Sequence, residues 1–287
     1  MEQPQKIRLF ASRDFSGNFD TSFAFIKQNY GAILKPLLYL IPILLIASFF
    51  MPNNMDMSDM AGYTDPLDIY RDMFTFSFFV AYLFMMMAML LMTTYVISYL
   101  ALYSRSENGI VDSKDVWSKA FKSILPVFAA SIIFGVLVSI GTLLCIIPGI
   151  IVYVYLGFYM YVYIIEDKGI IESFQRSYEL VKDNWWVTLG FGIVIALIVG
   201  IASAVFTLPT YMIMLGQALD IDFLTSDVYA YIATFINSVG SLLLYPILYI
   251  SMGIMYFSHR NRLEGVDMES EIDNIGNNGS KNTPNGW

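Results

Sequence analysis

The side chains of this chain of 287 residues form no recognisable catalytic motif. His259 is its only histidine, and it lies beside Ser258 and Arg260 at the end of a long apolar run. One histidine cannot build the multi-histidine sites that hold iron in membrane oxygenases. No Ser-His-Asp set, HExxH motif or glycine-rich phosphate loop can be assembled from the sequence either. The sequence therefore predicts a protein that is not an enzyme and has no cofactor.

A methionine-rich segment is the one candidate metal site. The stretch MPNNMDMSDM places four thioethers at M-x-M and M-x-x-M spacing, on Met51, Met55, Met57 and Met60. Soft thioether ligands suit Cu(I). However, the chain contains 17 methionines, so their abundance also explains the cluster. We expect no metal site, with Cu(I) at these methionines as the alternative.

The composition is that of a membrane protein. Hydrophobic residues make up 57% of the chain and charged residues 14%, whereas about a quarter of the residues in soluble domains are charged. The single Cys145 excludes a disulfide within the chain, and no basic patch suggests a nucleic-acid partner. About thirty mostly polar residues precede the first apolar run, so we expect no cleaved signal peptide.

Long runs without a charged residue predict six transmembrane helices, because a charge at the bilayer centre costs about 2.5 to 3.5 kcal/mol. Pro148-Gly149 predicts the bend of a hairpin between the third and fourth helices, and Pro209 predicts the end of the fifth, followed by a short interfacial helix. Basic residues flank both ends of the hairpin, so a re-entrant hairpin over 123–165 stays open as an alternative. The predicted spans are 36–51, 73–103, 123–147, 149–165, 185–208 and 228–258.

This topology places nearly all Lys and Arg residues on one side of the membrane. If the N-terminus is cytoplasmic, every Lys and Arg except Arg71 lies in a segment on the cytoplasmic side, as the positive-inside rule requires. We therefore expect a multi-pass protein of the bacterial inner membrane with both termini in the cytoplasm. Residues 1–14 form a polar N-terminal segment, 15–262 the all-α membrane domain, and 263–287 an Asn- and Gly-rich tail predicted to be disordered.

An amphipathic helix is predicted just before the fifth span. Its apolar residues recur three or four positions apart, and two tryptophans follow, which is typical of a helix lying in the headgroup layer. Glu172 and Arg176 are four residues apart and are expected to pair. The predicted anchors here are Phe174, Tyr178, Val181, Trp185 and Trp186.

The same pattern occurs 155 residues earlier, with anchors at Phe19, Phe23, Ile26 and Tyr30. A weaker third copy, residues 115–124, contains Trp117. The chain is thus predicted to contain three repeats, each an interfacial helix followed by two spans. The alternative, that any helix beside a membrane shows this pattern, stays open.

Several motifs within residues 148–186 resemble those of one bacterial membrane family. They are PGI at 148–150, Glu166, the stretch SFQRSYEL and a following tryptophan, and the matching positions are Pro148, Gly149, Glu166, Arg176 and Ser177. The family is related to the membrane domain of glycerophosphoryl diester phosphodiesterases and to the YciC-like proteins. The resemblance implies a multi-pass inner-membrane protein. Only 25 residues follow Arg262, so we expect no catalytic phosphodiesterase domain.

These observations favour a non-enzymatic scaffold or accessory factor that organises membrane lipid or partner membrane proteins. The predicted spans contain no Asp, Glu, Lys, Arg or His, which argues against ion-coupled transport. A passive conduit for lipid or a small solute is the alternative, because prolines within spans free backbone groups that can line a cavity. A membrane-embedded enzyme is the third hypothesis. The prolines concerned are Pro42, Pro148, Pro209 and Pro246.

Overall fold

A computed structural model describes residues 5–51, 67 and 74–265, and these contain helices but no strand. The chain divides into two compact units. The first comprises Met1–Asn29, Ile97–Ile193 and Ile250–Trp287, and the second comprises Tyr30–Val96 and Val194–Tyr249. The predicted disordered tail lies almost wholly outside the described residues.

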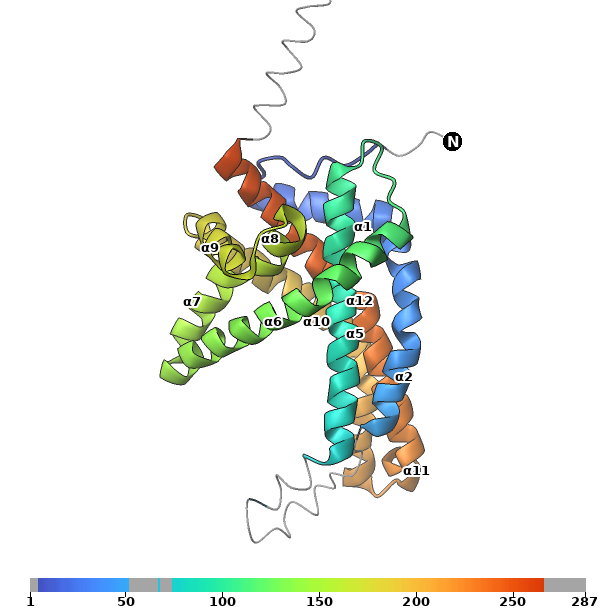
Figure 1. Ribbon diagram of the computed structural model, residues 1–287. Coiled ribbons are helices and arrows are strands. Elements are labelled where there is room, and N and C mark those ends of the chain that lie inside the picture. The colour runs from blue at the N-terminus through green and yellow to red at the C-terminus, as the bar shows by residue number, and fades with distance from the viewer. Residues whose placement is uncertain (1–4, 52–66, 68–73, 266–287) are drawn as a thin grey trace, which may run out of the picture. The chain divides into compact units, whose positions relative to one another are not determined.

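Eleven helical elements follow one another along the described part of the chain (Figure 1). They are α1 (Phe15–Leu37), η1 (Leu38–Leu40), α2 (Ile41–Phe50), α5 (Phe76–Arg105), α6 (Ser113–Leu144), α7 (Ile146–Leu156), α8 (Tyr159–Glu166), α9 (Ile170–Val181), α10 (Trp185–Leu219), α11 (Asp222–Thr225) and α12 (Asp227–Glu264).

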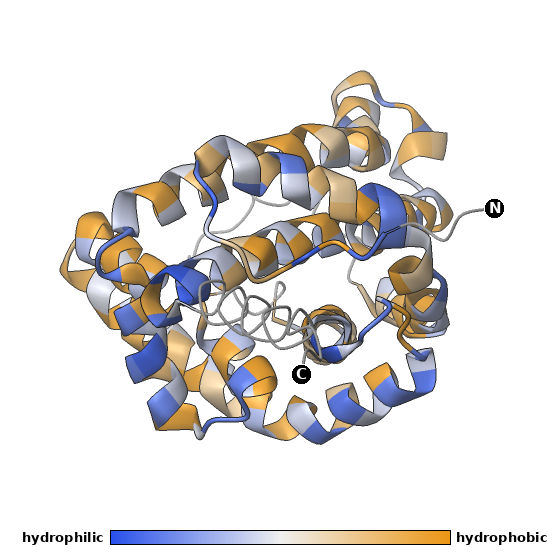
Figure 2. Ribbon diagram, turned by 90° about the horizontal axis from the view of Figure 1, so that it is seen from above, coloured by the Kyte–Doolittle hydropathy of each residue, from blue (hydrophilic) through white to orange (hydrophobic). Residues whose placement is uncertain are grey.

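Six stretches of helix among the described residues are long and apolar enough to cross a membrane. The expected all-α membrane fold is therefore confirmed. Orange, hydrophobic residues predominate on the helices in Figure 2. The six stretches are Phe15–Phe50, Phe76–Arg105, Ser113–Leu144, Ile146–Glu166, Trp185–Leu219 and Asp227–Glu264.

The hairpin bends at Cys145, three residues before the predicted position. Cys145 is extended, with φ −173° and ψ 153°, and separates α6 from α7. Pro148 lies in the first turn of α7, where a helix tolerates proline because the N–H groups there have no partner within the helix. Gly149 lets the two helices approach, since a Cβ at this position would lie 3.0 Å from Cα of Thr142.

Proline does not end the fifth span, so that prediction is wrong. α10 continues through Pro209 to Leu219, and α12 likewise continues through Pro246. A proline within a helix removes one backbone hydrogen bond, and spanning helices accommodate this loss by local adjustment. Residues 210–219 are accordingly the end of α10 and not a separate interfacial helix.

Only one of the three predicted interfacial helices is a separate element. α9 is followed by a turn at 182–184 before α10 begins. Residues 19–30 are instead part of the continuous helix α1, and residues 115–124 are part of α6. The first and third copies therefore belong to long helices that continue without a break past these residues.

The second unit is held by contacts between α1, α2, α10 and α12. Phe49 of α2 stacks on Tyr231 of α12, with ring centroids 5.6 Å apart. The Tyr30 hydroxyl donates a hydrogen bond to the carbonyl of Leu243. Gly240 allows Phe206 of α10 to pack directly against the α12 backbone, because a Cβ at Gly240 would overlap that ring.

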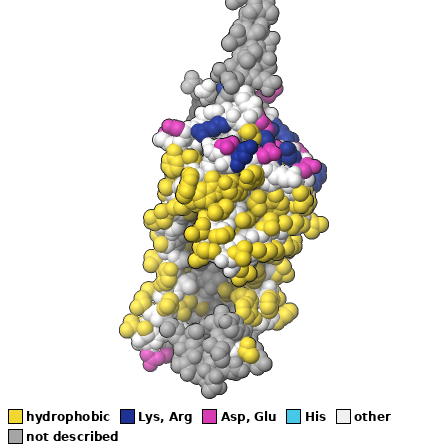
Figure 3. All heavy atoms as spheres, turned by 90° about the vertical axis from the view of Figure 1, so that its left-hand side faces the viewer, with side chains coloured by type: hydrophobic (Ala, Val, Ile, Leu, Met, Phe, Trp, Pro, Cys, Tyr) yellow, Lys and Arg dark blue, Asp and Glu magenta, His cyan; other side chains and the backbone are white. Residues whose placement is uncertain are grey.

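The core of the first unit is aromatic, whereas the end of its hairpin is uncovered. Tyr103, Phe158 and Tyr256 are all fully buried. At the hairpin tip, Leu143 is 87% exposed and Ile146 is 69% exposed, which water would disfavour and lipid would not. On the face drawn in Figure 3, hydrophobic side chains gather directly below a group of charged side chains.

Candidate functional site

The site is built around the carboxylate of Glu166, the last residue of α8, whose side chain is only 5% exposed. The Tyr256 hydroxyl donates a 2.7 Å hydrogen bond to Oε1. Three cations surround the two oxygens: Arg176 Nε at 3.3 Å, Lys168 Nζ at 3.6 Å and Arg260 Nε at 3.9 Å. A buried carboxylate requires such compensation, because its desolvation costs several kcal/mol.

A second carboxylate, Glu264 at the end of α12, links two of these cations. One oxygen accepts from Arg176 Nη2, and the other accepts from Arg260 Nε at 2.8 Å. The guanidinium of Arg260 also lies over the ring of Phe10, 5.3 Å from its centroid. α8, α9 and α12 are therefore joined by one network of ion pairs, and the N-terminal segment packs against it.

The turn between α8 and α9 places Glu166 in this network. Asp167 adopts the left-handed conformation, with φ 54°, and ends α8. Its carboxylate accepts from Arg105 and Lys119, both at 2.9 Å. Burial alone would raise the pKa of Asp167, but the hydrogen bonds and charges of Lys119 and Arg105 outweigh it and lower that pKa below its usual value.

The start of α9 also depends on a carboxylate. Gly169 precedes the helix, and its N–H donates to Glu172 Oε2 at 3.3 Å. Glu172 thus caps α9. Arg176 pairs with Glu166, Glu179 and Glu264. The expected Glu172–Arg176 pair is not among the ion pairs of the described residues, so that prediction is wrong.

Ser177 satisfies backbone groups at the break between α7 and α8. It is fully buried, and its hydroxyl donates to the carbonyl of Tyr155 at 2.9 Å and accepts from the N–H of Phe158 at 3.0 Å. Buried backbone groups without partners would cost about 1 to 3 kcal/mol each. Glu166, Arg176 and Ser177, three of the motif residues, therefore act together to hold the α8–α9 hairpin against its neighbours.

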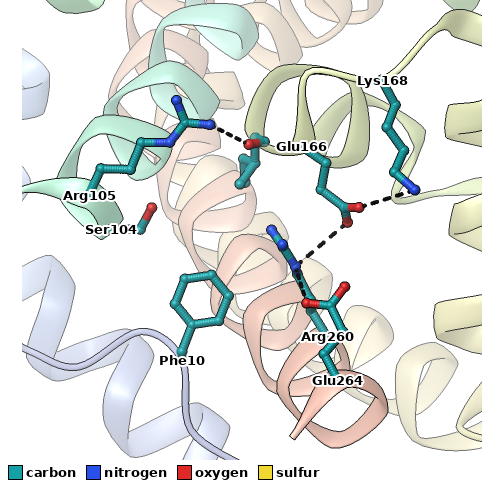
Figure 4. A pocket seen from close by; sticks show the side chains of 8 residues that line it. Phe10, Ser104, Arg105, Glu166, Lys168, Arg260 and Glu264 are labelled. Atoms are coloured by element: carbon teal, nitrogen blue, oxygen red, sulfur yellow. Dashed lines mark hydrogen bonds and ion pairs between the residues drawn. The ribbon is translucent and has the colours of Figure 1, made fainter. Parts of the chain in front are cut away.

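A pocket of about 490 Å³ opens beside the network (Figure 4). Three cationic side chains and two carboxylates line it, together with one hydroxyl residue and two apolar side chains. The carboxylates of Glu166 and Glu264 point toward Arg260 in the close-up view. The lining residues are Phe10, Ser104, Arg105, Ile165, Glu166, Lys168, Arg260 and Glu264.

The N-terminal segment is anchored so that Phe10 reaches the pocket. The Lys6 ammonium donates to the carbonyl of Ser104 at 3.3 Å, and the N–H of Ile7 donates to the Tyr103 hydroxyl at 2.9 Å. Phe10 itself packs edge-on against Phe257 of α12, with ring centroids 4.9 Å apart. Residues predicted only to be a polar segment therefore contribute one wall of the site.

His259 lies close to the network in sequence but has a different environment. It is buried at 2% exposure, and its Nε2 lies 2.8 Å from the hydroxyl of Thr188. Its ring packs edge-on against Phe158. The hydroxyl and the aromatic ring give His259 a packing role inside the first unit.

Two of the predicted membrane anchors are buried within the protein, which corrects their assignment. Phe174 is 8% exposed and stacks on Tyr159 of α8, and Val181 is fully buried. The apolar face of α9 packs on neighbouring helices, so these two side chains do not reach lipid. Phe23, Tyr178 and Trp186 are exposed, whereas Phe19, Ile26, Tyr30, Trp117 and Trp185 are partly exposed.

Most residues of the proposed Cu(I) site lie outside the described part of the chain. Met55, Met57 and Met60 lie in the undescribed segment 52–66, and only Met51 of the four candidates is described. Within the described part of the chain, no three His, Cys, Asp or Glu residues are grouped so that they could hold a metal ion.

Half of the network around Glu166 could not be anticipated from the sequence, because it comes from α12. Its partners Tyr256 and Arg260 are ninety or more residues away along the chain, and no local spacing connects them to Glu166. Glu264, which joins the network through Arg176 and Arg260, is equally distant. Arg176 was singled out by its motif. Arg105 and Arg260 follow long apolar runs on the predicted cytoplasmic side, and this position is the only sequence feature that could have indicated a role in the site.

Comparison with known proteins gives a family without a described activity. A family model described as a domain of unknown function, DUF7847, matches residues 69–252, more than half of the chain. Neither curated proteins nor solved structures gave a match. The matched range includes all five motif residues but ends before Tyr256, Arg260 and Glu264. The chain belongs to the DUF7847 family.

Proposed function

We propose that this chain is a non-enzymatic membrane protein that organises lipid or partner membrane proteins through the charged end of its first unit, where Glu166, Arg176, Arg260 and Glu264 form ion pairs. The observation that carries the proposal is the network around Glu166, in which Arg176 of α9 ties the ends of α8 and α12 together. A set of helix ends locked by ion pairs is a rigid platform, which suits a scaffold better than a moving carrier.

The contacts of the two carboxylates support this proposal over an enzyme. Glu166 and Glu264 are each engaged by at least two cations. A general acid or base must come within hydrogen-bond reach of the proton that it transfers. The oxygens of Glu166 and Glu264 are instead occupied by neighbouring cations, which favours a structural role.

The proposed location is the bacterial inner membrane, with both termini in the cytoplasm. Six apolar stretches support insertion in a membrane. The distribution of Lys and Arg supports the orientation, because the network cations all come from segments expected on the cytoplasmic side. The conduit alternative has less support, because α10 and α12 continue as helices through Pro209 and Pro246.

Copurification tests this proposal. The full chain is extracted from its native membrane in lipid-retaining particles, and bound lipids and proteins are identified by mass spectrometry. We expect a reproducible lipid or membrane-protein partner that is reduced by Trp186→Ser, because Trp186 is 79% exposed. Ile110→Ser is the matched control, since Ile110 is 65% exposed but lies in a loop.

Two results would oppose the proposal. One is a bulk lipid mixture with no enriched component and no protein partner for the wild type. The other is solute leakage from vesicles containing the purified protein that clearly exceeds leakage from empty vesicles, which would favour the conduit.

A further inference from the structure

The pocket beside Glu166 has more hydrogen-bond donors than its own carboxylates use. Arg105 makes both of its described bonds through Nη2, to the carbonyl of Ile165 and to Asp167. Arg260 donates to Glu264 through Nε and also interacts with the Tyr256 hydroxyl, which leaves part of its guanidinium for a ligand. Lys168 approaches Glu166 only at 3.6 Å. Among the described residues, the pocket therefore offers further N–H groups from three cations.

The acceptors in the pocket are, by contrast, already engaged. Both oxygens of Glu264 are bonded to guanidinium groups, and both oxygens of Glu166 are in contact with cations or with the Tyr256 hydroxyl. A ligand that brings acceptors and negative charge is thus better matched to the pocket than one that brings donors. Arginine and lysine together are the usual partners of phosphate.

The pocket is also accessible and of suitable size. The side chains of Arg105 and Lys168 are 56% and 39% exposed. Its volume of about 490 Å³ lies within the roughly 300 to 1,000 Å³ of small-molecule sites. A phosphate with part of its ester substituent fits within this space.

A purely structural explanation accounts for only part of this arrangement. α5, α8 and α12 all end at the pocket, at Arg105, Glu166 and Glu264, and cations near helix C-termini offset the partial negative charge there. Offsetting the partial charge of helix ends requires only that cations lie nearby. It does not account for an open pocket between the cations or for the exposure of Lys168.

We propose that this pocket binds a phosphate group, with Lys168, Arg105 and Arg260 as its donors. The inference deepens the proposed function, on which it rests, by naming the lipid chemistry that the charged end recognises. A lipid headgroup is the favoured carrier, because the pocket lies where three membrane-length stretches of helix end, and such ends meet the headgroup layer. Free phosphate has the same chemistry and is separated by the experiment.

Binding to the purified full chain in detergent tests the proposal, with dioctanoyl phosphatidylglycerol as the probe and native mass spectrometry as the readout. We expect Lys168→Gln to weaken binding about tenfold, as the loss of a charge-assisted hydrogen bond does. Lys182→Gln is the matched control, because Lys182 is an exposed lysine at the end of α9 that does not line the pocket. An equal loss in both variants would reduce the effect to general charge attraction and overturn the proposal.

A second pair of variants tests the same site in the opposite direction. Glu264→Gln removes a negative charge from the pocket wall and is expected to tighten phosphate binding. Glu179→Gln removes a carboxylate that also pairs with Arg176 but does not line the pocket, so binding should stay unchanged. Weaker binding in Glu264→Gln, with its thermal stability retained, would contradict an anion site.

Two competitors identify what is recognised. Dioctanoylglycerol has the same tails without phosphate and should not compete, whereas effective competition by it would overturn the proposal. Inorganic phosphate that competes would show that the phosphate group alone suffices, and failure to compete while the lipid binds would assign the site to a lipid headgroup. Because copurification measures partners and these assays measure the pocket, the proposed function and this inference can fail separately.

Discussion

Arg176 Nε lies 3.3 Å from Glu166 Oε2, and the two side chains are only 12% and 5% exposed. Arg176 also reaches Glu264, so this cation of α9 contacts both carboxylates of the network, as Arg260 of α12 does. Its position in the middle of a short helix, between the ends of α8 and α12, makes it the link between these elements.

Replacing Arg176 by Gln should destabilise the first unit strongly. The change leaves two carboxylates with less compensation, and breaking a buried ion pair costs about 3 to 5 kcal/mol. We expect the low end of this range, because Lys168 and Arg260 stay near Glu166. Thermal unfolding in detergent measures the effect. Lys182→Gln, an exposed control, should change stability by less than about 0.5 kcal/mol, and similar losses in both variants would contradict this account.

Ser177→Ala should cost about 1 to 3 kcal/mol, because it leaves the buried N–H of Phe158 without its partner. Ser118→Ala is the control, since Ser118 is an exposed serine on α6. The difference between the two variants is measured by unfolding under the same conditions. A Ser177→Ala protein as stable as the control would show that the backbone at the α7–α8 break finds another partner.

Two glycines of the hairpin should respond in opposite ways to alanine. A Cβ at Gly149 would overlap the Thr142 side chain, and overpacking of this kind costs about 1 to 3 kcal/mol. A Cβ at Gly135 meets nothing within 4 Å, so alanine there should stabilise α6 by up to about 1 kcal/mol through helix propensity. Unfolding measurements that give the same sign for both would contradict the close α6–α7 contact.

The Asp167 ion pairs should give stability a weak dependence on pH. Because the pKa of Asp167 is lowered in the folded protein, its contribution is fully present above the ordinary aspartate pKa and is lost as pH falls through the lowered value. The side chain is 58% exposed, so the contribution should be under about 1 kcal/mol. Wild type and Asp167→Asn should therefore differ at neutral pH and converge in strong acid. A difference that grows on acidification would contradict this sign.

The sequence predicted the number of apolar stretches because hydrophobicity over twenty residues is a local property. It did not predict where helices break. The effect of proline depends on its place in a helix: Pro148 lies in the first turn of α7, and Pro209 lies within α10. The true bend, at Cys145, has no residue type that marks it.

The site was only partly predictable for a related reason. Local spacing suggested that Arg176 pairs with Glu172. Arg176 instead forms ion pairs with carboxylates of α8 and of the end of α12. Amphipathic spacing likewise identified the apolar face of α9 correctly. It could not tell whether lipid or protein covers that face, and Phe174 and Val181 are covered by protein.

Cysteine labelling in sealed vesicles tests the central claim, that the charged end faces the cytoplasm and the α10–α12 connection faces the other side. Cys145 is the only cysteine, so its replacement by Ala gives a background for single cysteines at Lys114 and Asp222, both exposed. An impermeant maleimide should label Lys114→Cys only in inside-out vesicles and Asp222→Cys only in right-side-out vesicles. Labelling of both positions from the same side would contradict the six-span topology and the placement of the pocket at the cytoplasmic face.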